Sequence, residues 1–78
     1  MDRIIALMIQ GNGDDIRCES LGQDPESGKW AGGINLYHGD SFHAMLVSSL
    51  LVFSSSEAAV ADMGRIVREV RALDLAAN

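Results

Sequence analysis

Cysteine and proline are nearly absent from this chain, which has one of each among its 78 residues. The lone Cys18 cannot form an intramolecular disulfide. Because small secreted domains often carry several such bridges, we expect a reducing, cytoplasmic location. Pro25 lies in Gly22–Gly28, the only segment with the composition of a linker. This composition predicts one exposed loop.

Basic residues are also few: six lysines and arginines stand against eleven aspartates and glutamates, for a formal net charge of −5. Affinity for phosphate backbones comes mostly from Lys and Arg, so we expect no direct binding to nucleic acid or to an anionic membrane. The short length excludes enzymes that need separate cofactor and substrate lobes. It predicts a single small α+β domain over residues 1–78.

Long hydrophobic runs are missing as well. Ile4–Ile9 is shorter than the core of a signal peptide, and no small-residue cleavage site follows it. Ala44–Phe53 is interrupted by Ser48 and Ser49 and has about half the length that a bilayer requires. We expect neither an export signal nor a membrane span.

The first quarter of the chain has the composition of a β-hairpin. Arg3–Gln10 is rich in Ile and Leu and is followed by Asn12-Gly13, a strong signal for a two-residue hairpin turn. Asp15–Leu21 is therefore expected to return antiparallel to it. Alternation along this second strand would place Ile16 and Cys18 on one face and Arg17 and Glu19 on the other.

Two further segments, Lys29–Tyr37 and Phe42–Phe53, are predicted to be strands. A helix is the competing interpretation of Phe42–Phe53, because several of its residues tolerate helix. The valines, the adjacent serines and the Gly39-Asp40 turn before the segment favour a strand. The Gly32-Gly33 pair is expected to mark a bulge or a close approach of another backbone.

The last third of the chain has a clear helical pattern. Ser54 and Glu57 have the spacing of a capping box, and apolar residues then recur at helical intervals over about Ser55–Leu73. Asp62 and Glu69 are spaced to form surface ion pairs with Arg65. The complete prediction is a four-stranded antiparallel sheet, in the order 2-1-4-3, followed by one C-terminal amphipathic helix packed on one face (ββββα).

His38, Asp40 and His43 are the only group in the sequence with metal-ligand chemistry. Imidazole and carboxylate suit zinc or another divalent ion, but the sequence offers no evident fourth ligand or supporting acid. We interpret the three as ordinary turn and strand residues and expect no metal and no cofactor.

No catalytic residues are expected either. Cys18 has no base beside it on its own face of the predicted strand, and a helix cap accounts for Ser54. The glycines lack the Gly-x-Gly-x-x-Gly spacing of a dinucleotide site. These observations indicate that the protein is not an enzyme.

The predicted strands Ile4–Ile9 and Ala44–Phe53 are apolar on both faces. Such strands are normally buried on both sides, whereas one helix covers a single face. The alternative is a strongly twisted sheet that curls over its own core. We favour self-association, with Leu7, Val47 and Leu51 as candidate interface positions.

The sequence therefore favours a non-enzymatic protein-interaction or regulatory module that acts as a homodimer and binds another protein. A first alternative is a small acidic inhibitor, of the kind found in phages, that occupies a basic nucleic-acid-binding surface. A second alternative is a metal-dependent site at His38, Asp40 and His43.

Overall fold

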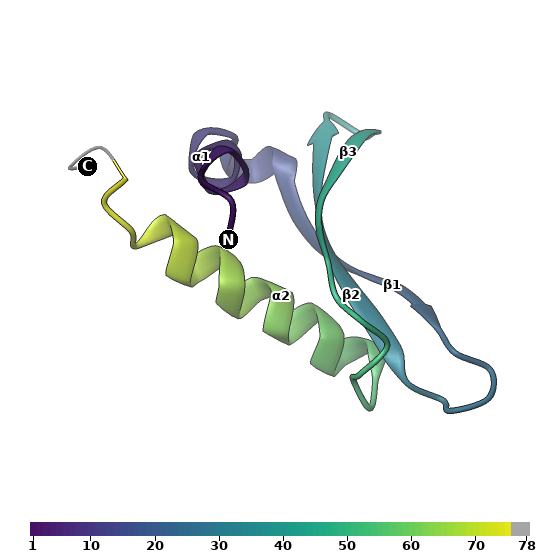
Figure 1. The fold of residues 1–78 in the computed structure, drawn as a ribbon. Coiled ribbons are helices and arrows are strands. Elements are labelled where there is room, and N and C mark those ends of the chain that lie inside the picture. Colours follow the sequence, from purple (N-terminus) through teal and green to yellow (C-terminus); the bar gives the residue numbers. More distant parts are fainter. Residues whose placement is uncertain (76–78) are drawn as a thin grey trace.

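Two helices lie on one side of a three-stranded antiparallel sheet in this computed structural model, which describes residues 1–75 (Figure 1). The elements follow the order helix α1 (Arg3–Gly11), 3-10 helix η1 (Gly13–Asp15), strands β1 (Ile16–Gln23), β2 (Trp30–His38) and β3 (Ser41–Ser48), and helix α2 (Ser56–Arg71). Within residues 1–75, neither α-helix combines the length and the apolar character needed to cross a bilayer.

The α+β class and the antiparallel sheet are confirmed, but the expected four strands are wrong. The sheet has three strands in the order β1-β2-β3, a simple meander in place of the order 2-1-4-3. Register pairs Cys18 with Ile34 and Ile34 with Val47 across the sheet. β2 is thus the central strand, and β1 and β3 are both edges.

The segment predicted as the first strand, Arg3–Gln10, is instead helix α1. Asp2 caps it, because its Oδ1 accepts hydrogen bonds from the backbone N–H groups of Ile4 (2.8 Å) and Ile5 (3.3 Å). Asn12-Gly13 is not a hairpin turn. The Asn12 side chain donates to the carbonyl of Met8 at 2.6 Å and so closes the last turn of α1.

The predicted strand Phe42–Phe53 ends earlier than expected, at Ser48. Ser49 explains the break, because its hydroxyl accepts from the backbone N–H of Gly32 at 2.8 Å, in the place of a strand carbonyl. The chain then stays beside β2 in irregular form. Trp30 donates to the carbonyl of Phe53 at 2.7 Å and accepts from the N–H groups of Val52 and Phe53.

Helix α2 confirms the C-terminal helix, but its cap lies one residue later than the capping box predicted. Ser55, not Ser54, is the N-cap, and its Oγ accepts from the backbone N–H of Ala58 at 3.0 Å. The expected ion pairs are present, because Arg65 contacts Asp62 and Glu69 at 2.9 Å each.

Side-chain hydrogen bonds also join the end of α1 and the residues after it to the C-terminal end of α2. The side chain of Gln10 donates to the carbonyls of Val70 (2.8 Å) and Leu73 (2.9 Å), and Arg71 donates to the carbonyl of Gly13 at 2.8 Å. These bonds connect the end of α1 and the start of η1 to the C-terminal end of α2.

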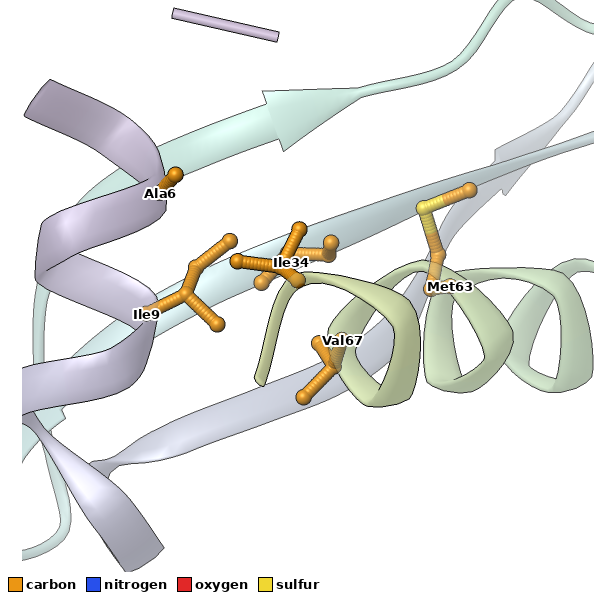
Figure 2. Packing of buried hydrophobic residues seen from close by; sticks show 6 residues of the cluster. Ala6, Ile9, Ile34, Met63 and Val67 are labelled. Carbon is orange, nitrogen blue, oxygen red and sulfur yellow. The ribbon is translucent and has the colours of Figure 1, made fainter. Parts of the chain in front are cut away.

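The core lies between the two helices and β2. Figure 2 shows Ile9 of α1 and Val67 of α2 on either side of Ile34, and both isoleucines are fully buried. The central cluster consists of Ala6, Ile9, Ile34, Met63, Val67 and Val70.

Gly32 confirms the close approach expected at the glycine pair. A Cβ added there would lie 2.8 Å from the Met63 Cγ and 2.9 Å from the carbonyl oxygen of Ala59. At Gly33, on the other face, a Cβ would meet only the flexible side chain of Leu21. α2 can therefore pack on β2 only because Gly32 has no side chain.

We predict that Ser55→Ala lowers the free energy of unfolding by about 1 kcal/mol, because α2 loses its N-cap hydrogen bond. Ser54→Ala is the matched control and should leave stability unchanged within error. Urea denaturation of the two variants measures both values. A larger loss in Ser54→Ala than in Ser55→Ala would contradict this assignment of the cap.

We predict that Gly32→Ala destabilises the fold by about 1–3 kcal/mol, the usual cost of overpacking against backbone. Gly33→Ala should cost less, because the end of the Leu21 side chain can move away. Urea denaturation compares the two variants. Equal losses would show that α2 does not require its close contact with Gly32.

Candidate functional site

The two faces of the sheet differ in what covers them. On one face Cys18, Ile34 and Val47 pack in or against the core beneath the helices. On the opposite face neither helix covers the strands (Figure 1), and Leu21, Phe42 and Met45 there are exposed. We call one group of residues on this face the open-face cluster. Its members contact one another or lie opposite one another across the strands: Arg17, Glu19, Leu21, Asn35, Tyr37, Phe42 and Met45.

A polar network lies at the centre of this cluster. Glu19 Oε1 accepts hydrogen bonds from the Asn35 side-chain amide at 2.9 Å and from the Tyr37 hydroxyl at 2.6 Å. These two bonds hold the pKa of Glu19 below its ordinary value. Asn35 is only 5% exposed, and its Oδ1 is buried without a hydrogen-bond partner within residues 1–75.

Arg17 is held at one end of the cluster by three contacts. Its guanidinium lies 4.1 Å from the centre of the Tyr37 ring and donates to the carbonyl of Gly39 at 2.7 Å. Asp40 lies 3.5 Å away and forms an exposed ion pair with it. The cation is therefore ordered on the sheet surface.

The remaining members of the cluster are apolar and largely exposed. Phe42 meets the Tyr37 ring edge to face, with centroids 5.8 Å apart and planes at 87°. Met45 lies opposite Asn35 in the register, and Leu21 covers Gly33. Phe42 is 57% exposed, Met45 50% and Leu21 38%. These three side chains surround the polar network with apolar surface.

The charge states within the cluster suit binding more than proton transfer. The hydrogen bond to Glu19 raises the pKa of Tyr37, while the same bond lowers that of the carboxyl. At neutral pH Tyr37 is thus a neutral donor and Glu19 a carboxylate. Both shifts move these groups away from the range in which they could exchange protons at neutral pH.

The three metal-ligand candidates are separated by the fold into a pair and a single residue. The rings of His38 and His43 stack with centroids 4.3 Å apart and planes at 24°, while Asp40 turns toward Arg17. Within residues 1–75, no group of three or more His, Cys, Asp and Glu side chains is close enough to hold a metal ion.

Cys18 lies half-buried on the helix side of β1. Burial raises the pKa of its thiol, and the charges of Arg71 and Arg68 oppose this only partly. Burial thus outweighs the two positive charges and disfavours the reactive thiolate form.

The interface candidates chosen from the sequence lie on three different parts of the fold. Leu7 points outward from α1 and is 45% exposed, and Leu51 lies in the segment between β3 and α2 and is 47% exposed. Val47 packs against the core on the helix side of the sheet. The three do not form one surface, and the sequence analysis did not select Phe42, Met45 or Tyr37.

Comparison of the chain with protein-family models, with curated proteins and with solved structures finds no match.

We predict that Glu19→Gln weakens the dependence of stability on pH below neutrality. The pKa of Glu19 is lower in the folded chain than its ordinary value of 4.5. Its stabilising contribution is therefore complete above that value and is lost as pH falls through the folded pKa. Denaturation across the acid range should give a shallower loss of stability for Glu19→Gln than for the wild type.

Glu26→Gln, in the exposed turn between β1 and β2, is the matched control and should behave as the wild type. If stability falls with decreasing pH equally in Glu19→Gln and the wild type, the proposed role of the hydrogen bonds from Asn35 and Tyr37 is contradicted.

Proposed function

We propose that the protein is a non-enzymatic protein-interaction module that acts as a homodimer, with the open-face cluster of each chain packed against that of the other. The observation that supports this proposal is an ordered group of aromatic, apolar and paired polar side chains on the one sheet face that no helix covers.

The size of a standard interface favours the sheet face over the outer side of α1. A standard interface buries about 800 Å² on each partner, which is about one sixth of the 4880 Å² accessible surface of this chain. Only a broad face of the molecule offers that much. The outward side of α1, where Ile4 and Leu7 are exposed, belongs to a helix of nine residues and is too small by itself.

The charge distribution favours a second copy as the occupant. The chain carries a net charge of −5, so two copies repel each other over most of their surfaces. Within the open-face cluster Arg17 and Glu19 cancel, which makes the cluster formally neutral. A twofold interface must be complementary to itself, and a face with one cation and one carboxylate can satisfy that condition.

The composition and order of the cluster also support binding. Tyr, Phe, Met and Arg are enriched in interface cores, where aromatic and arginine side chains supply much of the binding energy. Here Arg17, Glu19 and Tyr37 are already fixed by contacts within the chain. Less conformational entropy is lost on association when the side chains are ordered beforehand.

We predict that the wild-type protein sediments as a dimer of twice the 8.4 kDa chain mass. Met45→Asp should dissociate it into folded monomers, because the variant places a charge in the apolar part of the proposed interface. Sedimentation equilibrium gives the mass, and circular dichroism checks that the variant remains folded.

Leu50→Asp is the matched control, since Leu50 is 80% exposed and lies outside the open face. This variant should remain a dimer. An 8.4 kDa wild-type species at high concentration would contradict the proposal, as would dissociation by Leu50→Asp with no effect of Met45→Asp.

A further inference from the structure

The imidazoles of His38 and His43 come from neighbouring strands and stack at the end of the β2–β3 hairpin. Their centroids are 4.3 Å apart, and their planes are inclined by 24°. Both residues are exposed, and within residues 1–75 neither ring takes part in a hydrogen bond or an ion pair.

The local backbone explains why two residues five positions apart in sequence meet. Gly39, with φ of 61°, allows the tight turn that pairs His38 with Ser41. The register then shifts between the pairs Tyr37–Phe42 and Leu36–Ala44, which leaves His43 as the extra residue of a bulge. Bulges re-aim side chains, and here the bulged residue lies against the ring of His38.

We propose that His38 and His43 together bind one borderline divalent transition-metal ion, such as Ni²⁺, Cu²⁺ or Zn²⁺, as a two-imidazole chelate. Neutral imidazole nitrogen suits these ions, whereas Ca²⁺ and Mg²⁺ require oxygen ligands. The two rings are exposed, so modest side-chain rotations can direct one nitrogen of each toward a common ion. Water would complete the coordination sphere.

Asp40 is not part of this site. Its carboxylate lies 3.5 Å from the guanidinium of Arg17, and that guanidinium lies over the ring of Tyr37. A site with two protein ligands exchanges its metal readily, because structural sites use four and catalytic sites three. The protein is therefore expected to take up added metal and not to retain it through purification.

The test is a calorimetric titration of the intact protein with Ni²⁺ in a buffer that does not coordinate metal. We expect one ion per chain. His38→Ala and His43→Ala should each weaken binding at least about tenfold, because each removes one of two chelating ligands. Asp40→Asn, the matched control in the same turn, should bind as the wild type.

Nuclear magnetic resonance supplies a second readout, because bound Ni²⁺ should selectively broaden the ring resonances of both histidines. Met45→Asp should bind Ni²⁺ as tightly as the wild type, since both ligands belong to one chain. The proposal is overturned by an absence of binding, by unchanged affinity in either histidine variant, or by a loss in Asp40→Asn equal to theirs.

Discussion

The close contact between α2 and β2 at Gly32 is the constraint on which the rest of the structure depends. The carbonyl of Ala59 and the side chain of Met63 occupy the space where any other residue would have its Cβ. This contact fixes the height and direction of α2 over the sheet, so that Met63 and Val67 reach Ile34. α1 then packs against the remaining side of that cluster, and both helices lie on the same face of the sheet.

That arrangement also determines the candidate site. Because both helices lie on one face of the sheet, neither α1 nor α2 covers the side chains of the opposite face. Glu19 accepts hydrogen bonds from the Asn35 amide and the Tyr37 hydroxyl, but Asn35 Oδ1 has no partner within residues 1–75, and Phe42 and Met45 stay half exposed. The expectation of an uncovered apolar face rested on a strand at Ile4–Ile9, which is helix α1, and the face that the helices leave uncovered carries polar and apolar side chains together.

Much of the fold could be predicted from sequence where one signal dominated. α2 has a clear helical period, and the polar alternation of Arg17 and Glu19 identified the outer face of β1. The predictions of two elements were wrong for physical reasons. α1 is only nine residues long, so its helical period repeats few times, and its isoleucines suggest a strand. Ser49 ended β3 through a side-chain bond to Gly32 that no strand propensity describes.

The candidate cluster was missed because Phe42, Met45 and Tyr37 come together only through the register of three strands.

The central claim is that the open face of one chain packs on the open face of another. An isotope-filtered nuclear Overhauser experiment on a mixture of labelled and unlabelled protein measures this contact directly. We expect intermolecular signals between the Met45 methyl group and the aromatic protons of Phe42 and Tyr37, as the proposed dimer requires. Intermolecular signals confined to Ile4 and Leu7 of α1, or none at all from the open face, would contradict it.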